Sequence, residues 1–192
     1  MDSEIEQIKR LASEIDGWLS DAEGELLYTL AKNVPKGQAI VEIGSWKGKS
    51  TVWLAKGAEA GQNNKVYAID PHRGSKSHVS EGKEDTYPKF LVNLSKARVK
   101  NRVVPLVMTS SQAAQYWQGS IGLLWIDGSH EYEDVKHDFL VWKQHLSLGT
   151  VVALHDYDKP GPAQVAQEYL VNAEEFVVTH HVDTMLAARK CR

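Results

Sequence analysis

The chain has 192 residues, a formal net charge of −3 and a pI of about 6.2. This length suits one α/β domain with its own core, and the mild acidity excludes the basic field that attracts nucleic acid or anionic lipid. Cys191 is the only cysteine, so a disulfide framework is excluded and a reducing, cytoplasmic setting is favoured. We see neither a signal-peptide pattern nor an apolar run long enough to span a membrane, and expect no membrane partner.

Two amphipathic helices are predicted at the start of the chain. Apolar residues recur at three- and four-residue steps over 5–19, which indicates the first helix. The second is predicted over 21–35, with Asp21 able to cap it. We expect residues 1–36 to form a helical extension of a domain that covers 37–192.

Short apolar runs then alternate with helical stretches. The predicted strands cover 39–43, 65–69, 103–108, 122–126 and 150–154, and the helices between them cover 50–58, 87–98, 111–117 and 131–145. This alternation indicates βαβ units, and therefore a largely parallel sheet with helices on both faces and right-handed crossovers. The polar stretch 72–86 is expected to be a mobile loop.

The end of the chain departs from this alternation. After a helix over 162–170, strands are predicted at 175–179 and 184–188. The few residues between them are too short for a parallel crossover, so these strands must form an antiparallel hairpin. His180 and His181 are expected in its turn.

Residues 41–51 form an apolar strand that runs into a glycine turn and allows two interpretations. A phosphate-binding loop, G-x-x-x-x-G-K-[ST], needs four residues between its glycines so that its N–H groups surround a phosphate. Only three residues separate Gly44 from Gly48. The alternative is a turn in which Glu42 ends the strand and the glycines let the backbone approach a nucleoside-like ligand closely. In that interpretation Lys49-Ser50 is an ordinary part of the first helical turn.

Ligands of an open α/β sheet bind beyond the carboxyl ends of its strands. Asp70 ends the second predicted strand, where its carboxylate can accept hydrogen bonds from both hydroxyls of a ribose. Asp70 can equally cap its own Asp-Pro turn. Trp46 and Trp53 are candidates either for shaping this pocket or for packing.

Asp127 and Asp156 follow the fourth and fifth predicted strands, which we expect to be neighbours. Neighbouring strands end about 5 Å apart, so the two carboxylates would converge with His155 or His130 on one point. Like charges this close repel unless a cation or a proton lies between them. A divalent metal would meet that need and lower the pKa of a substrate hydroxyl. The alternative is that both aspartates cap turns and His155 is a buried structural histidine.

His130 is the candidate general base, because an ordinary histidine pKa near 6.5 lets it accept a proton at working pH. It can instead cap the helix that follows. Asp138 lies two turns along that helix, and we expect it to pair with a surface cation.

Four segments together resemble class I S-adenosylmethionine (SAM)-dependent methyltransferases, closest to the branch of bacterial sugar, macrolide and aminocoumarin O-methyltransferases. The segments are Val41-Glu42-Ile43-Gly44 with Gly48, Tyr67-Ala68-Ile69-Asp70, Leu124 to Tyr132 with its Ile-Asp-Gly-x-His-x-Tyr pattern, and Val151 to Tyr157 with its His-Asp-Tyr pattern. The resemblance implies a Rossmann-like α/β fold with a seven-stranded, mostly parallel sheet of order 3-2-1-4-5-7-6. It also implies a C-terminal antiparallel hairpin and N-terminal helices.

The resemblance further implies where SAM binds. The methionine part lies over the glycine turn, the ribose at the end of the second strand and the adenine after the third. The implied cofactor-binding residues are Glu42, Gly44, Ser45, Gly48, Asp70, Ser110, Ser111, Gln112 and Asp127.

Metal-dependent relatives hold their ion with an acidic residue at the Asp127 position and a pair of Asp or Asn residues at the next strand end. This chain has His155-Asp156 there. Imidazole is a poor ligand for Mg²⁺ but suits manganese, iron or zinc. Asp127, His155 and Asp156 are therefore candidate ligands, and both the identity and the presence of an ion are left open.

The implied reaction is methyl transfer from SAM to a hydroxyl of a small molecule, with His130 and Asp127 as catalytic residues. The N-terminal helices and the loop 72–86 would form a lid that selects the acceptor. A SAM-binding protein without catalysis is the first alternative, and a P-loop-like nucleotide-binding protein is the second. A homo-oligomer is left open.

Overall fold

The computed structural model describes residues 3–73 and 85–192. Its sheet has seven strands in the order β3-β2-β1-β4-β5-β7-β6, which confirms the predicted topology. Neighbouring strands pair in parallel as far as β5, and β7 then pairs antiparallel with both β5 and β6. The predicted antiparallel hairpin at the end of the chain is therefore confirmed.

The strands and helices follow one another in the predicted alternation. The strands are β1 (Ala39–Ile43), β2 (Val66–Ile69), β3 (Val103–Leu106), β4 (Ile121–Ile126), β5 (Leu146–Leu154), β6 (Phe176–Val182) and β7 (Met185–Lys190). The helices are α1 (Glu4–Ser13), α2 (Asp21–Lys32), α3 (Lys49–Ala60), α4 (Tyr87–Lys96), α5 (Ser110–Gln115), α6 (Tyr132–Lys143) and α7 (Pro160–Ala166), which continues as the π-helical turn η2 (Gln167–Val171).

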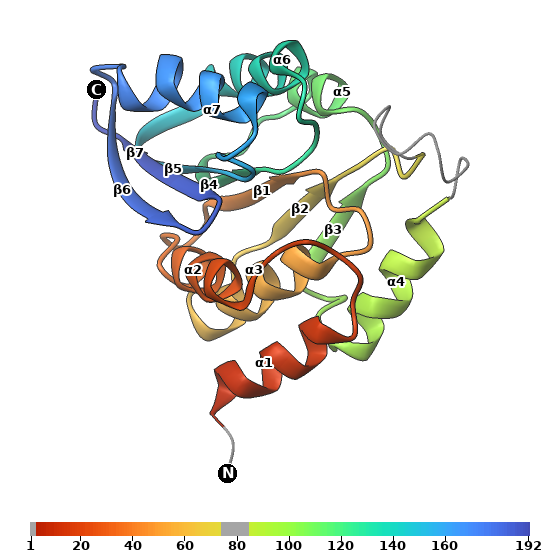
Figure 1. The fold of residues 1–192 in the computed structure, drawn as a ribbon. Coiled ribbons are helices and arrows are strands. Elements are labelled where there is room, and N and C mark those ends of the chain that lie inside the picture. Colours follow the sequence, from red (N-terminus) through yellow and green to blue (C-terminus); the bar gives the residue numbers. More distant parts are fainter. Residues whose placement is uncertain (1–2, 74–84) are drawn as a thin grey trace.

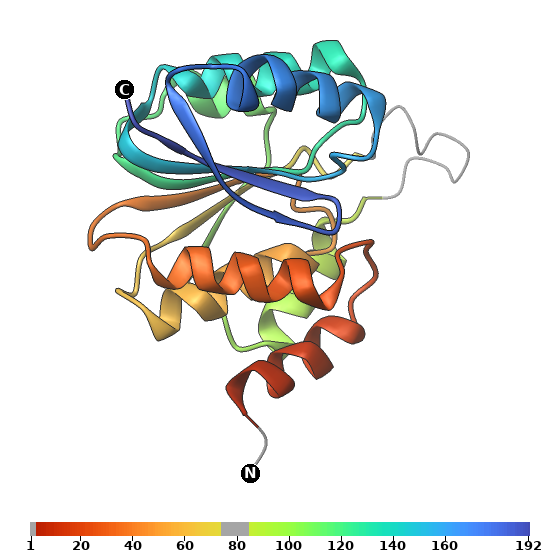
Figure 2. The same cartoon turned by 60° about the vertical axis from the view of Figure 1, so that its left-hand side comes forward.

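The sheet lies between two helical layers, with α1 to α4 on one side and α5 to α7 on the other (Figure 1). Figure 2 shows the same layers nearly edge-on, with the β6–β7 hairpin at one end of the sheet. Alternate residues of each strand serve opposite layers, because side chains alternate across a sheet. In β1, Ile40 joins the core under α1 to α4, whereas Val41 and Ile43 join the core under α5 to α7.

Two elements, α1 and β5, differ most in length from their predictions. Helix α1 ends at Ser13 instead of continuing to residue 19, yet Ile15 and Leu19 are buried, because the irregular segment after α1 folds back onto the core. The apolar periodicity therefore predicted which residues are buried, but it did not predict where the helix ends. Strand β5 begins at Leu146, four residues earlier than predicted, and pairs there with Ile121 beyond a register shift in β4.

The predicted position of the hairpin turn is wrong. His180 and His181 lie in β6, paired with Ala187 and Leu186 of β7, and the turn follows at Asp183, which has a φ of 48°. Because β6 is the edge strand, exposed polar side chains do not interrupt it.

Most of the predicted loop 72–86 lies outside the described residues. Its two ends meet, since His72 Nδ1 lies 2.9 Å from Thr86 Oγ1. Within the described ranges, no helix combines the length and the apolar character that crossing a membrane requires.

Candidate active site

Four neighbouring strands end in register at one edge of the sheet. Ile43 of β1 pairs with Ile69 of β2 and with Ile126 of β4, and Ile126 pairs in turn with Leu154 of β5. The residues that directly follow these four therefore stand in a row along the edge. They are Asp70, Gly44, Asp127 and His155.

Gly44 lies between Asp70 and Asp127 in this row, directly against the backbone that follows β4. Its φ is +87°, and a Cβ atom built on it would lie 2.1 Å from the carbonyl oxygen of Asp127. Only glycine fits this turn. The neighbouring Ser45 is 2% exposed, and its Oγ has no hydrogen-bond partner within the described residues. An orphaned buried hydroxyl beside a closely approached glycine fits a site whose ligand supplies the missing partner.

Glu42 is completely buried below this turn. Its carboxylate accepts hydrogen bonds from Ser50 Oγ and Thr51 Oγ1, both at 2.6 Å. Burial raises the pKa of Glu42 to about 8, although the two hydroxyls act in the opposite direction and Asp127 and Asp70 add to the rise.

The expectation for the first turn of α3 is wrong in one respect. Ser50 is no ordinary helix residue, because together with Thr51 it fixes the buried Glu42. The Ser50 hydroxyl is thereby engaged away from any phosphate, which disfavours the P-loop interpretation. Lys49 donates to the carbonyl of Gly17 at 3.0 Å. The predicted contact between Glu42 and a cofactor stays a prediction.

Asp70 orders the loops that follow β1 and β2. Its Oδ2 accepts from the N–H of Trp46 and its Oδ1 from the N–H of His72, both at 2.7 Å. The turn-capping interpretation is therefore correct, and it leaves the ligand-binding one intact, because each carboxylate oxygen keeps a second lone pair.

The two tryptophans named from the sequence have different surroundings. Trp46 stacks on Trp18, which is 72% exposed, with ring centroids 5.1 Å apart. Trp53 is fully buried against Gly24, where a Cβ would come within 2.3 Å of its ring. Trp53 is therefore a packing residue, whereas Trp46 lies at the rim of the site.

The second half of the site is a chain of charged side chains after β4 and β5. His155 Nδ1 lies 3.1 Å from Asp127 Oδ1 and 3.4 Å from Asp156 Oδ2. On the other side of Asp156, the same Oδ2 lies 2.7 Å from Nε2 of His130. The structure thus brings together all four residues that the sequence nominated for chemistry.

His155 is the cation of this cluster. Burial alone would lower its pKa, but hydrogen bonds to Asp127, Asp156 and Glu23 raise it to about 12. The pKa of Asp127 is raised by burial against the opposing effect of His155, and the pKa of Asp156 is lowered by His155 despite its own burial. The carboxylates repel each other less because an imidazolium lies between them.

Three atoms of this cluster could serve as metal ligands, since one each from Asp127, His155 and Asp156 lie within 4.8 Å of one another. The two carboxylates fit a divalent ion. The ring of His155 does not fit in this arrangement, because an Nδ1 that donates its proton to Asp127 has no lone pair for a metal.

The sequence did not reveal Glu23, which lies on α2 and is 1% exposed. Its Oε2 is 3.2 Å from His155 Nε2, and its Oε1 accepts from the N–H and the hydroxyl of Thr184 at 2.9 and 2.7 Å. In the sequence, Glu23 is recognisable only as part of a capping box with Ser20. This pattern indicates where a helix starts, and it does not predict a contact with His155 at the end of β5.

Comparison with known proteins decides the family. Residues 41–157, which contain most of the site, match the model of a methyltransferase domain family. The chain belongs to this methyltransferase family. The sheet order and the C-terminal hairpin are those of the class I methyltransferase fold, as the resemblance implied.

Solved structures share this fold over nearly the whole chain. The O-methyltransferase TomG of Streptomyces achromogenes, solved with SAM, is 19% identical with a TM-score of 0.69, covering 100% of this chain and 91% of TomG. An O-methyltransferase of Bacillus cereus, solved with SAH, is 18% identical with a TM-score of 0.67, covering 99% and 92%. An uncharacterized protein of Sinorhizobium fredii, y4gI, is 30% identical over 118 residues. The match covers 61% of this methyltransferase but only 13% of y4gI.

Two of the three side chains predicted near the adenine, Ser110 and Ser111, attach α5 to α6. Ser110 Oγ accepts from Trp142 Nε1 at 2.9 Å, and Ser111 Oγ lies 2.6 Å from His137 Nε2. Gln112 closes a capping box with Thr109. An adenine contact through this segment stays a prediction.

The expectation for Asp138 is wrong. It pairs with no lysine or arginine in the described part of the chain; it is half-buried and hydrogen-bonded to Ser110. Burial raises its pKa to about 6, against the effects of Ser110 and His137.

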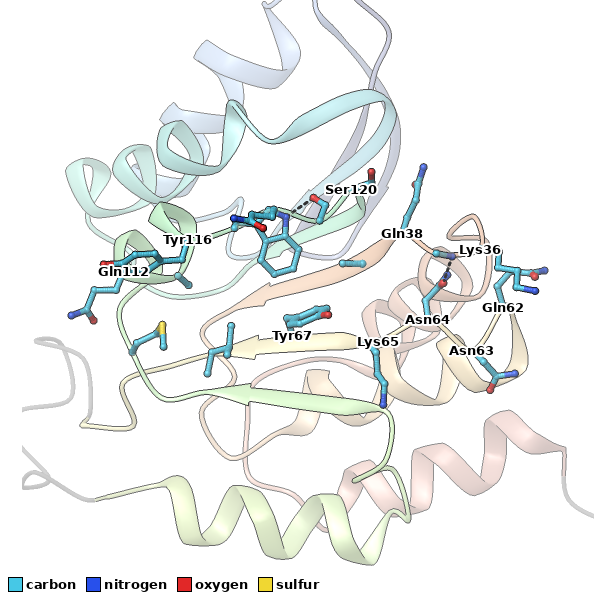
Figure 3. A pocket seen from close by; sticks show the side chains of 18 residues that line it. Lys36, Gln38, Gln62, Asn63, Asn64, Lys65, Tyr67, Gln112, Tyr116 and Ser120 are labelled. Carbon is cyan, nitrogen blue, oxygen red and sulfur yellow. Dashed lines mark hydrogen bonds between the residues drawn. The ribbon is translucent and has the colours of Figure 1, made fainter.

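A groove of about 660 Å³ lies elsewhere on the methyltransferase, between α5 and the beginnings of β1 and β2 (Figure 3). Tyr67, Tyr116 and Trp117 are among its lining residues. Of the predicted site residues only Gln112 borders it, so this groove is distinct from the row of strand ends.

Proposed function

We propose that this methyltransferase transfers the methyl group of SAM to a hydroxyl of a small molecule. The observation that carries the proposal is the 2.7 Å contact between His130 Nε2 and Asp156 Oδ2, beside Asp127 and next to the Gly44 turn. An oriented proton acceptor at the edge of a methyltransferase sheet is what hydroxyl methylation requires. Similarity of the fold to O-methyltransferases solved with SAM or SAH supports the choice of donor and reaction.

The β1 and β2 side of the site suits SAM. Gly44 permits close approach, Ser45 has an unused buried hydroxyl, and Asp70 has lone pairs for ribose hydroxyls. Acidic groups along the edge complement the positive charge of a sulfonium. When bound, SAM supplies an electrophilic methyl group on that sulfonium.

His130 is the proposed proton acceptor. Its Nε2 lies 2.7 Å from Asp156 Oδ2, and a neutral ring that carries its proton on this nitrogen has its lone pair on Nδ1. The side chain is 46% exposed and within reach of an acceptor molecule. The substrate oxygen forms its bond to the methyl carbon as the carbon–sulfur bond breaks, and Nδ1 of His130 takes the hydroxyl proton. Asp156 orients the ring and stabilises the imidazolium that results. Asp127, fixed by His155, contributes negative potential beside the reacting groups.

Asp127 and Asp156 are the residues that would hold a divalent ion, Mg²⁺ or Mn²⁺. Such an ion would lower the pKa of the bound hydroxyl. None of the steps above depends on it, and activity with and without EDTA tests this part separately.

The proposal is tested by calorimetry with SAM and SAH, followed by methyl transfer from labelled SAM to a panel of phenols and sugar hydroxyls. We expect SAM to bind and acceptor-dependent SAH to form. The variant His130→Asn should lose about 100-fold in kcat with a SAM Kd within about twofold of the unmodified protein. His180→Asn, which changes an exposed histidine on β6, is the matched control and should retain full activity. Failure to bind either SAM or SAH would refute the proposal.

A further inference from the structure

We infer that Glu23, on α2, is a positioning residue of the methyl-transfer site and that it acts by holding the His155 ring against Asp127 and Asp156. The expected effect of Glu23 on the rate of methyl transfer rests on the proposed function. The contacts that fix the His155 ring do not depend on that function, and the NMR experiment below measures them separately.

The carboxylate of Glu23 is saturated with donors from three parts of the fold. Oε2 accepts from the N–H of Ser20 at 2.9 Å and faces Nε2 of His155 at 3.2 Å. Oε1 accepts from the N–H of Thr184 at 2.9 Å and from its hydroxyl at 2.7 Å. The start of α2, the β6–β7 turn and the end of β5 therefore fix one buried carboxylate between them.

The ring of His155 depends on this carboxylate for its orientation. It is 5% exposed, and the ring of Trp125 lies alongside it with centroids 5.5 Å apart. In histidine, the hydrogen bond made by one nitrogen determines what the other can do. Because Glu23 accepts from Nε2, the Nδ1 side is turned toward Asp127 and Asp156.

The contact chain continues to the proposed proton acceptor. Asp156 Oδ2 is shared between His155 Nδ1 at 3.4 Å and His130 Nε2 at 2.7 Å. A His155 ring released by loss of Glu23 would therefore move the carboxylate that orients His130. The effect is expected in the rate of methyl transfer and not in SAM affinity.

The competing explanation is that Glu23 only caps α2. The capping box is present, with Ser20 Oγ accepting from the N–H of Glu23 at 3.2 Å. A cap serves the helix equally well with glutamine as with glutamate, and it requires neither burial nor a histidine. Nearly complete burial and the His155 contact are therefore unexplained by capping alone.

The test compares Glu23→Gln with Ser20→Ala. Glutamine can accept through one atom only, so it cannot satisfy both Thr184 and His155. We expect Glu23→Gln to lower kcat at least tenfold with KM for SAM and SAM Kd within about twofold. Ser20→Ala removes the hydroxyl that accepts from the N–H of Glu23 and donates to Asp183. It leaves the backbone N–H at position 20 and the Glu23–His155 contact, so it should lower Tm while kcat stays within about twofold.

Nitrogen NMR of ¹⁵N-histidine-labelled protein provides a readout that needs no activity. The His155 Nε2 signal of the unmodified protein should be that of a hydrogen-bonded, protonated nitrogen, and it should change in Glu23→Gln but not in Ser20→Ala. Glu23→Asp, which retracts the charge by one methylene, should reproduce the Glu23→Gln changes and decides the matter if Glu23→Gln does not fold.

Unchanged kcat and unchanged His155 signals in the Glu23 variants would overturn the inference, as would an equal kcat loss in Ser20→Ala. An unmodified protein that transfers no methyl group, with His155 signals that still depend on Glu23, would refute the proposed function and leave the contact established.

Discussion

Two pairs of carboxylates lie along the same edge of the sheet and are held in different ways. Glu42 and Asp70 accept only from neutral donors, namely hydroxyls and backbone N–H groups. Asp127 and Asp156 face imidazoles, and the cluster that holds them extends to Glu23 on α2. Neutral donors hold a carboxylate in place, whereas an imidazolium also lowers the pKa of the carboxylates that it faces and so opposes the effect of their burial.

We call Glu42 and Asp70 the cofactor half of the site and Asp127 and Asp156 the chemical half. Gly44→Ala should have the largest effect, because Gly44 lies where the two halves meet. The new Cβ would lie 2.1 Å from the Asp127 carbonyl oxygen, so we expect a loss of more than about 4 kcal/mol of stability and no measurable SAM binding. Thermal unfolding and calorimetry measure both. Gly37→Ala is the matched control, since its φ is +83° but nothing lies within 4 Å of the new Cβ, and it should cost only about 1–2 kcal/mol. Equal losses would show that backbone conformation alone matters.

Asp127→Asn tests the chemical half. The amide keeps the shape but removes the charge opposite His155, so kcat should fall about 100-fold while the SAM Kd stays within about threefold. Single-turnover kinetics and calorimetry separate the two quantities. Asp158→Asn, an exposed acid nearby in sequence, should change neither.

Asp70→Asn tests the cofactor half, and the expected result is the reverse. One acceptor for a ribose hydroxyl is lost, so the SAM Kd should rise about tenfold while kcat at saturating SAM stays within about threefold. Equal losses of SAM binding in Asp70→Asn and Asp127→Asn would remove the division of roles.

Glu42→Gln tests the raised pKa of the buried Glu42 carboxylate. Folding raises the pKa of Glu42 from 4.5 to about 8, so between these values the folded chain binds a proton that the unfolded chain has released. Stability contributed by this group therefore falls as pH rises from about 4.5 to 8. The variant lacks this dependence, so its Tm relative to the unmodified protein should increase across that window. A constant difference in Tm would contradict the raised pKa.

The positions of Gly44 and Asp70 could be predicted from the sequence because their determinants are local. Gly44 and Asp70 each directly follow an apolar strand, and parallel pairing brings such positions to one edge. The hairpin was predictable too, from the short spacing of its strands. The position of its turn was not, because the solvated outer edge of β6 accepts His180 and His181 without ending the strand.

In the chemical half, the sequence predicted which residues meet but not which contacts they make. Strand ends predicted that Asp127, His155, Asp156 and His130 would converge, but not that Nδ1 of His155 would face both carboxylates. That outcome depends on Glu23, which is 132 residues away from His155 in sequence.

The sequence by itself determined the alternation of strands and helices, the glycine turn and the residues at each strand end, since periodicity and glycine geometry act over a few neighbouring residues. The strand order was implied only by the family resemblance. Only the tertiary structure decided which donor faces each carboxylate. Burial makes such pairings strong, and burial depends on how α2, α3 and the β6–β7 turn pack onto the sheet.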